Sequence, residues 1–173
     1  MTSLPKLARR WHRIGAVAIA IPFLVVILSG ILLQLKKELA WVQPPTRTGS
    51  AETPSLEFAQ LLEIARTLPR AEIEGWEDID RIDVRPDKGI LKIRCANGME
   101  VQLDASTGEV LQVERRRSDL IESLHDGSWF HGLAKLWIFL PAGVVVLFLW
   151  LSGVYLWWLP RNLRRQKREA RGK

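Results

Sequence analysis

Two long apolar blocks without a charged residue constrain this chain more than any other feature. The first covers residues 14–35 and the second residues 136–159, so the blocks are 22 and 24 residues long. A helix needs about 20 apolar residues to cross the hydrocarbon core of a bilayer. A helix buried in a soluble core seldom stays uncharged for so long in a chain of this size. The sequence therefore predicts two transmembrane helices.

The first block could instead be a cleaved secretory signal, because Lys6, Arg9, Arg10 and Arg13 precede it. The apolar part of such a signal is about 7–15 residues long and is followed by a small-x-small cleavage site. This block is longer, and the chain continues from it with the letters LLQLKK at residues 32–37. We therefore expect a membrane anchor.

The charges that flank the two blocks predict the orientation. Residues 1–13 carry four Lys or Arg and no acid, and residues 160–173 carry seven Lys or Arg and one acid. The rest of the chain carries 14 basic and 18 acidic side chains. Cytoplasmic flanks collect Lys and Arg, so both termini are expected in the cytoplasm of a bacterium and residues 36–135 on the periplasmic side of its inner membrane. The basic tail follows a span directly, so we interpret it as a topology anchor that contacts anionic membrane lipid, and expect no nucleic acid as a partner.

Between the spans, residues 36–55 read as a linker rich in turn formers, and residues 56–117 as a small domain. A short amphipathic helix is predicted first, with Thr53 or Ser55 as its N-cap. Its apolar face consists of Phe58, Leu61, Leu62 and Ala65. Four alternating strands follow, whose inward sets are Ile82 and Val84; Leu91, Ile93 and Cys95; Met99, Val101 and Leu103; and Leu111 and Val113. The predicted fold class is an α+β membrane protein, with two antiparallel transmembrane helices flanking one helix on an antiparallel sheet.

The turn at residues 96–98 decides the register of the central hairpin. A two-residue loop would place Ile93 opposite Gln102, which mixes apolar and polar side chains on one face. A three-residue loop keeps the faces separate, with the pairs Cys95 and Met99, Ile93 and Val101, and Leu91 and Leu103. We therefore predict the three-residue loop with Gly98 in the left-handed conformation, and the same role for Gly108 in the next turn.

Cys95 is the one cysteine of the chain. A single thiol cannot cross-link its own domain, even on the side of the membrane where disulfides form. We therefore expect Cys95 to act as a small buried hydrophobic residue.

Residues 118–135 lead the chain back to the membrane as a short interfacial helix and an elbow. Within the two spans, small residues and prolines occur at matching depths when the count starts from each membrane face. Pro22 is then level with residues 152–153, and residues 29–30 are level with residues 141–143. Small residues let helices approach closely in lipid, so the two spans are expected to pack at these points.

Several segments together resemble the PepSY-associated transmembrane family. The letters DASTGE at residues 104–109 are similar to the closing turn of PepSY domains. WHRIG at residues 11–15, with SG at residues 29–30, resembles the first helix of the family. LHDG at residues 124–127 and SGVYLWW at residues 152–158 are similar to the segment before the final helix and to its end. The resemblance implies a periplasmic module that binds or restrains other proteins. Larger relatives with four spans include b-haem ferric-siderophore reductases whose histidines ligate the haem.

The residue types and motifs of the sequence favour a non-enzymatic role. A hydrolase needs a nucleophile with a base, or paired carboxylates in a pocket. The sequence contains no Gly-x-Ser-x-Gly, no His-Glu-x-x-His and no phosphate-binding glycine loop. No catalytic residue and no metal ligand is assigned.

Haem b is the alternative cofactor, and His125 and His131 are its candidate ligands. A six-coordinate b-haem takes two imidazoles at one depth. His12 lies at the other end of a span about 30 Å long, so it cannot share a site with the other two. His125 and His131 are six residues apart, which is not a same-face spacing on a helix, but a break at residues 126–127 or a homodimer could bring imidazoles together.

The functional hypothesis is therefore an inner-membrane PepSY protein without a cofactor. It would act as a binding, regulatory or accessory subunit for an unknown membrane or periplasmic protein, with a homodimer as a further candidate. The edge strands and Arg115, Arg116 and Arg117 are its candidate binding surfaces. The alternative is a b-haem redox subunit.

Overall fold

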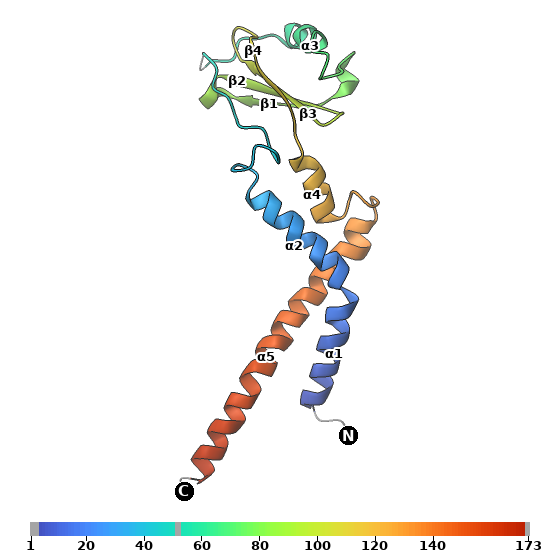
Figure 1. Ribbon diagram of the computed structural model, residues 1–173, viewed down its shortest axis with the longest axis vertical. Helices are drawn as coiled ribbons and strands as arrows, with labels where there is room; N and C mark the ends of the chain where they lie inside the picture. The colour runs from blue at the N-terminus through green and yellow to red at the C-terminus, as the bar shows by residue number, and fades with distance from the viewer. Residues whose placement is uncertain (1–3, 51–52, 172–173) are drawn as a thin grey trace. The chain divides into compact units, whose positions relative to one another are not determined.

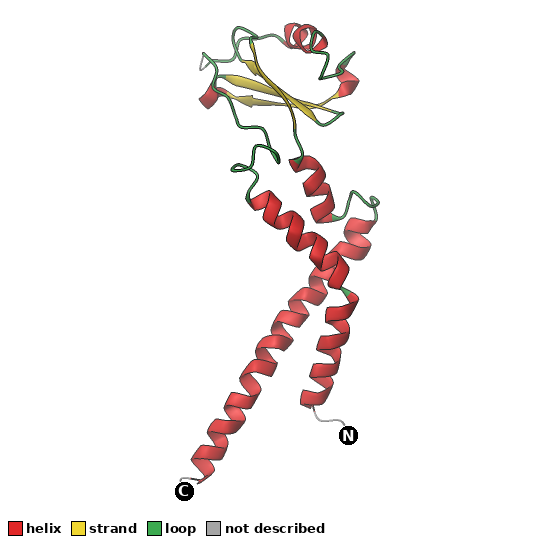
Figure 2. Ribbon diagram, in the orientation of Figure 1, coloured by secondary structure: helices red, strands yellow, loops and turns green. Residues whose placement is uncertain are grey.

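The computed structural model describes residues 4–50 and 53–171 of the chain. It divides into two compact units. Residues Ile31–Glu122 form one, called here the sheet unit, and Met1–Gly30 with Ser123–Lys173 form the other, the helical unit. Helices and one antiparallel sheet make the chain α+β, as predicted (Figure 2).

The sheet has four strands in the order β1-β2-β3-β4, each antiparallel to its neighbour (Figure 1). The strands are β1 (Ile79–Arg85), β2 (Ile90–Cys95), β3 (Met99–Asp104) and β4 (Val110–Arg115). Helix α3 (Phe58–Arg66) covers one face. Single helical turns at Trp76–Asp78 and Pro86–Lys88 precede β1 and β2. The predicted arrangement of one helix on an antiparallel sheet is therefore confirmed.

The hairpin of β2 and β3 has the predicted register. Leu91 pairs with Leu103 and Ile93 with Val101, so a three-residue loop joins the strands. Gly98 has a φ of 81°, and its N–H donates to the Cys95 carbonyl at 2.9 Å. Gly108 in the next turn has a φ of 75°, which is also in the left-handed region that favours glycine.

The inward sets of the two outer strands are only partly as predicted. Val113 pairs with Val101, but a bulge follows, so Leu103 pairs with Val110 where regular pairing would select Leu111. Leu111 therefore lies outside the core. On β1, Ile82 packs on the core, whereas Val84 is 48% exposed at the edge of the sheet.

The core lies between α3 and the sheet. Leu61 and Ala65 of α3 are fully buried, and Leu62 packs on the core from its edge. Phe58 was predicted to join this face but is exposed, with its ring edge-on to Trp76 at 6.3 Å. The core residues of the sheet and its loops are Ala71, Ile73, Leu91, Ile93, Cys95, Met99, Val101, Leu103 and Ala105.

The N-cap of α3 is Glu57, so the predicted caps Thr53 and Ser55 are wrong. The backbone N–H of Glu57 donates to the Gln60 side chain at 3.2 Å. This is the bond that the residue at N3 makes to the N-cap in a capping box, here with glutamate at the N-cap. Ser55 instead donates its N–H to the Ala105 carbonyl, which holds it in an extended segment.

Cys95 is buried in this core, as predicted. Burial raises the pKa of its thiol to about 11, and the negative charges of Asp78 and Glu100 add to the shift. The thiol is therefore protonated at neutral pH, and reagents reach it when the sheet unit opens.

The other face of the sheet is polar and is covered by residues 43–50, called here the strap. This part of the predicted linker therefore packs on the sheet. Gln102 binds it twice, accepting from the N–H of Arg47 at 2.8 Å and donating to the Pro45 carbonyl at 3.0 Å. Ser50 donates its N–H and its hydroxyl to Asp104. These bonds and the N–H groups of Thr107 and Ser106 lower the pKa of Asp104 far below its ordinary range.

The helical unit contains the apolar helices. The first apolar block is divided between α1 (Leu4–Ala18) and α2 (Ala20–Gln34), which are bent by 63° at Ile19. Pro22 explains the break, because it lacks the N–H that would bond to Ala18 and its ring displaces that carbonyl. Helix α4 (Ser118–Asp126) precedes a π-helical turn (Lys135–Phe139) that continues into α5 (Leu140–Arg171).

By length and composition, one helix of the described residues could cross a membrane. It is Lys135–Leu159, with a mean hydropathy of 2.2. Lys6–Ala18 and Ala20–Gln34 pass the same test only together, as a bent pair of the kind seen in a broken span or in a re-entrant loop.

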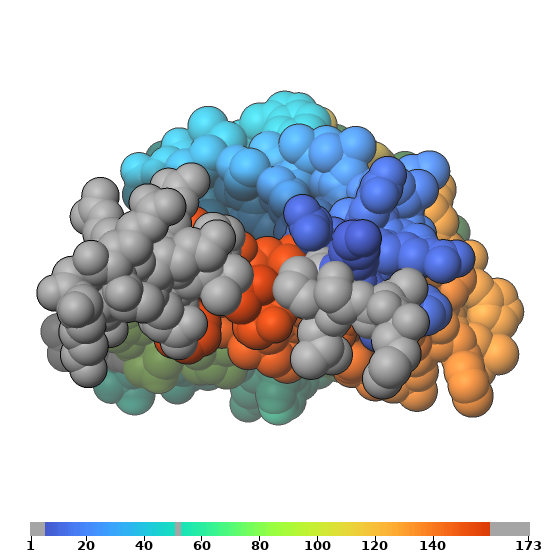
Figure 3. Space-filling view, turned by 90° about the horizontal axis from the view of Figure 1, so that it is seen from below, coloured from blue at the N-terminus to red at the C-terminus, as the bar shows by residue number. Residues whose placement is uncertain are grey.

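Helices α1 and α5 lie side by side (Figure 3). Gly15 lies against Leu149, and His12 Nδ1 lies 2.8 Å from the Ser152 hydroxyl. Ser152 is therefore level with His12 and not, as predicted, with Pro22. The prediction counted residues along straight helices of equal depth, and the bend at Ile19 invalidates that count.

Two glycine substitutions separate the backbone conformation of the turns from their packing. Gly98→Ala should lower the opening free energy of the sheet unit by about 1–2 kcal/mol, because alanine is strained at positive φ. Gly108→Ala should lower it further, because a Cβ there would lie 2.6 Å from Ile64 Cδ1, whereas the space at Gly98 is open to 4.0 Å. Alkylation of Cys95 in increasing urea measures this opening. Equal effects of the two variants would contradict the packing argument.

Candidate functional site

The His125 corner is the point where α4 ends, and its imidazole is fixed by α2. His125 Nδ1 lies 3.1 Å from the Val26 carbonyl and 3.1 Å from the Ser29 hydroxyl. A carbonyl only accepts, so Nδ1 carries the proton, and in the neutral ring Nε2 keeps a free lone pair. Gly30 lies against the ring, since a Cβ there would be 3.2 Å from His125 Cε1. Ser29 and Gly30 thus form the side of α2 that receives the His125 ring.

Asp126 and Gly127 complete the corner. Asp126 accepts from Lys135 Nζ at 2.7 Å and from the Ser128 N–H at 2.9 Å. The hydrogen bond from Lys135, followed by those from Ser128, lowers the pKa of Asp126 to about 2. Gly127 has a φ of 83°, and a Cβ at this position would collide with the ring of Phe139. Glycine is therefore required both by the backbone and by the close approach of the π-helical turn before α5.

An apolar groove of about 420 Å³ opens beside this corner within the helical unit. His125, Asp126 and Lys135 supply its polar atoms. The rest of its lining is Pro22, Phe23 and Val26 from α2 and Leu136, Phe139, Leu140, Ala142, Gly143 and Val146 from the second apolar segment. The groove is thus a hydrophobic slot with one imidazole and one ion pair at its edge.

The other histidines have separate partners. His131 Nδ1 accepts from the N–H of Leu133 at 3.1 Å in the loop after α4, and its side chain does not line the apolar groove. His12 lies at the α1–α5 contact beside Ser152. Of the two predicted haem ligands, only His125 therefore lines the apolar groove.

A buried charge network lies beneath the strap, and the sequence analysis did not identify it. The Glu100 carboxylate is fully buried and accepts from Lys92 at 3.2 Å and from Arg116 at 2.8 Å. Lys92 also donates to the Thr46 hydroxyl of the strap at 2.8 Å. The alternation of charged with apolar residues along β2 and β3 was the available signal, but it does not indicate what covers the polar face.

Arginines 94 and 116 extend the network to the end of the sheet. Arg94 pairs with Asp83 at 2.7 Å, and Arg116 donates to Asp119 at 3.0 Å. Burial opposes the charged form of Arg116, but the hydrogen bonds and charges of Asp119 and Glu100 outweigh it and raise the pKa of the guanidinium.

The predicted binding surface at residues 115–117 is therefore largely internal. Arg116 is buried, and Arg117 lies over the Trp41 ring at 4.9 Å while donating to the Trp41 carbonyl at 3.0 Å. Arg115 alone of the three is exposed.

Among the described residues, no group of three or more His, Cys, Asp or Glu side chains is placed to hold a metal ion. The described part thus offers an apolar groove with one imidazole, and a polar face built on buried ion pairs.

Comparison with known proteins gives one match. The model of the family described as the PepSY-associated TM region matches residues 9–173. Searches of the curated proteins and of the solved structures give no significant match.

Removing the charge of Glu100 tests the buried network. Glu100→Gln should lower the free energy of unfolding of the sheet unit by about 3–5 kcal/mol, because Lys92 and Arg116 would stay buried without their carboxylate. Glu114→Gln is the matched control, since its pair with Arg70 at 3.9 Å is exposed and should contribute less than about 1 kcal/mol. Hydrogen exchange of the β2 and β3 amides measures both. A loss of less than about 1 kcal/mol for Glu100→Gln would show that the network does not hold this face.

Proposed function

The chain belongs to the PepSY-associated transmembrane family, and from this premise we propose that it is a non-enzymatic accessory subunit of a bacterial inner membrane. It acts by binding another membrane protein, and its sheet unit is presented on the periplasmic side. No catalytic residue and no cofactor takes part.

Two spans with both termini in the cytoplasm fit this proposal. Lys135–Leu159 is one span, and the bent pair Lys6–Ala18 and Ala20–Gln34 is the other. The excess of Lys and Arg at residues 1–13 and 160–173 favours the cytoplasm for both ends. The structure does not describe the side chains of residues 160–173, so their expected contact with lipid stays a prediction.

The observation that carries the proposal is the apolar groove of the helical unit. It is lined almost entirely by apolar side chains of the two spans. At Gly143 the groove wall has no side chain, and a Cβ there would meet nothing within 4 Å. Helices associate in lipid through van der Waals packing, and small residues permit close approach of a second backbone. A transmembrane helix of a partner protein is the occupant that this shape and this setting favour.

A photo-crosslinking residue at Val146 tests the groove as a partner site. Val146 lines the groove, whereas Val144, two residues away on the same helix, does not line it and is 62% exposed. We expect a protein adduct from position 146 in native membranes and none from position 144. Gly143→Leu should abolish the adduct, because the added side chain fills the closest point of approach.

The mass of the adduct identifies the partner. An adduct with twice the mass of the chain would show that the partner is a second copy of this chain and not a different protein. Equal adducts from positions 144 and 146, or none from either, would contradict a partner at the groove.

A redox subunit is the second candidate, and the proton on His125 Nδ1 favours it. That hydrogen bond leaves Nε2 as a lone-pair donor beside an apolar slot, which is how a ligating histidine is usually held. A b-haem would supply one-electron chemistry. One chain places one imidazole at the groove, so a haem held by two histidines fits the described residues only where two copies share it.

An optical spectrum of the detergent-purified protein from haem-supplied cells, oxidised and then reduced with dithionite, tests this candidate. The accessory-subunit proposal predicts no Soret band. If a band appears and shifts on reduction, His125→Ala should abolish it and His131→Ala should leave it, because only His125 lines the groove. Loss in both variants would assign His131 as the second ligand.

A further inference from the structure

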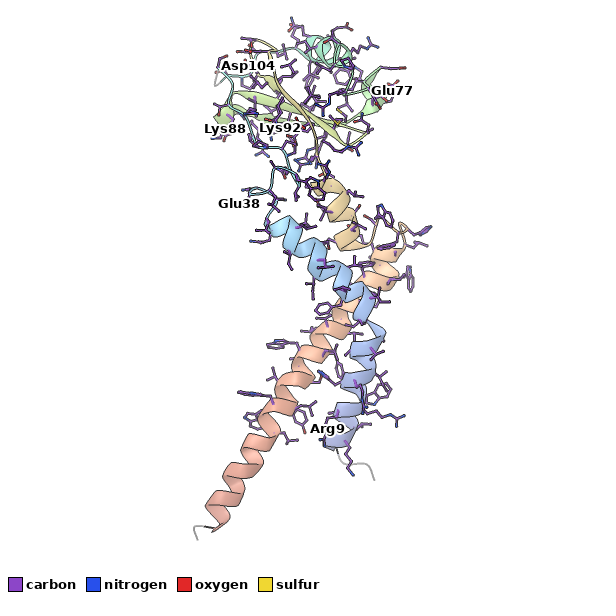
Figure 4. The ribbon with its side chains drawn as sticks, in the orientation of Figure 1. Arg9, Glu38, Glu77, Lys88, Lys92 and Asp104 are labelled. Carbon is purple, nitrogen blue, oxygen red and sulfur yellow. The ribbon has the colours of Figure 1, made fainter. Side chains whose placement is uncertain are left out.

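A second cavity, of about 350 Å³, lies wholly within the sheet unit, at the end of the polar face that the strap leaves uncovered. Seven cationic side chains and two carboxylates, Asp83 and Asp87, contribute to its lining, together with Gln43 and Thr46 of the strap. We call it the cationic pocket. Figure 4 labels two of its lysines, Lys88 and Lys92.

The floor of the cationic pocket is held rigidly. Lys92, Arg94 and Arg116 reach it from the sheet and from the segment after β4. Their side chains are only 5%, 12% and 8% exposed, and each is fixed by an ion pair with Glu100 or Asp83. Donors placed in this way lose little conformational freedom when a ligand binds.

The rim of the pocket carries cations without a carboxylate partner. Lys36, Lys37, Arg85 and Lys88 line it, and none of them forms an ion pair with another described residue. Of the two carboxylates in the lining, Asp83 is paired with Arg94, and Asp87 lies among the rim cations. A cavity whose walls carry an excess of one sign focuses its field and concentrates ions of the opposite sign.

Two buried polar atoms of the pocket's lining residues lack a hydrogen-bond partner. They are Arg94 Nε and Gln43 Oε1, and no other buried side-chain N or O of the described residues is left unsatisfied. An unsatisfied buried donor is costly, and more so when it is charged. Both side chains line the cationic pocket, although these two atoms are themselves buried.

We propose that the cationic pocket binds a phosphate group that carries an organic substituent. The pocket offers arginine and lysine donors from both its floor and its rim. Donors on several sides suit the acceptor oxygens of a tetrahedral anion better than the two oxygens of a planar carboxylate. A phospholipid headgroup and a soluble phosphate ester share this chemistry. Lys36 and Lys37 follow shortly after α2, the second half of the bent apolar pair. A phospholipid headgroup is therefore a source of phosphate that the chain would meet in a membrane.

The test uses full-length protein in neutral detergent and compares two variants with the same change in net charge. Arg85→Gln with Lys88→Gln removes two rim cations, and Arg70→Gln with Arg81→Gln removes two cations that lie outside the pocket on the same unit. Native mass spectrometry measures retention of phosphatidylglycerol against phosphatidylcholine, and calorimetry measures binding of glycerol 3-phosphate. Loss of two charge-assisted hydrogen bonds should weaken binding at least about tenfold in the rim variant.

The two probes separate the sources of the phosphate. Selective retention of phosphatidylglycerol that the rim variant loses and the control keeps would assign a headgroup. The same pattern for glycerol 3-phosphate alone would assign a soluble ester. Equal binding by the rim variant and the control would overturn the proposal, because attraction would then follow net charge and not this pocket.

Discussion

The buried carboxylate of Glu100 is the interaction on which the sheet unit depends. It lies on β3, fully buried, and holds Lys92 of the neighbouring strand and Arg116 of the segment after β4. Lys92 reaches the strap through Thr46, and Arg116 reaches the first turn of α4 through Asp119. One carboxylate thus connects the chain that enters the sheet unit with the chain that leaves it. Arg117 donates its N–H to the carbonyl of Val42, so these two segments also meet directly.

In the helical unit the corresponding constraint is the bend at Ile19. In a straight helix over residues 4–34, Ser29 and Gly30 would lie on the same helix axis as His12. Pro22 interrupts the hydrogen bonding, and α2 therefore takes a new direction. The carbonyl of Val26, the hydroxyl of Ser29 and the bare backbone of Gly30 then surround the His125 ring. The small residues of the first apolar block therefore serve two different purposes. Gly15 admits α5, and Gly30 admits an imidazole.

Local rules predicted the hairpin and the core but not what covers the polar face. The register of β2 and β3 followed from keeping Ile93 opposite Val101, since a slip by one residue would exchange the two faces. The bulge that displaces Leu111 leaves the apolar pattern of β4 unchanged, so the pattern could not reveal it. His125 was identified as a candidate from its residue type. Its partners on α2 could not be, because they depend on the angle of a proline break that no sequence spacing supplies.

The strap buries Lys92, Glu100 and Gln102, an environment that the polarity of these residues does not predict. Strands with one charged face normally expose it to water, and burying ions is costly unless they are paired and hydrogen-bonded. Here opposite charges on adjacent strands neutralise each other. The strap that lies across them contains two prolines, which have no N–H, so it has few donors of its own to satisfy. The side chains of Gln102 and Asp104 supply acceptors for the N–H groups of Arg47 and Ser50. Beside the first residues of the strap, at the cationic pocket, this balance fails and basic residues outnumber acidic ones. Each buried cation of the floor has a carboxylate partner, whereas the rim cations have none among the described residues, so the charge that a ligand would neutralise lies at the rim.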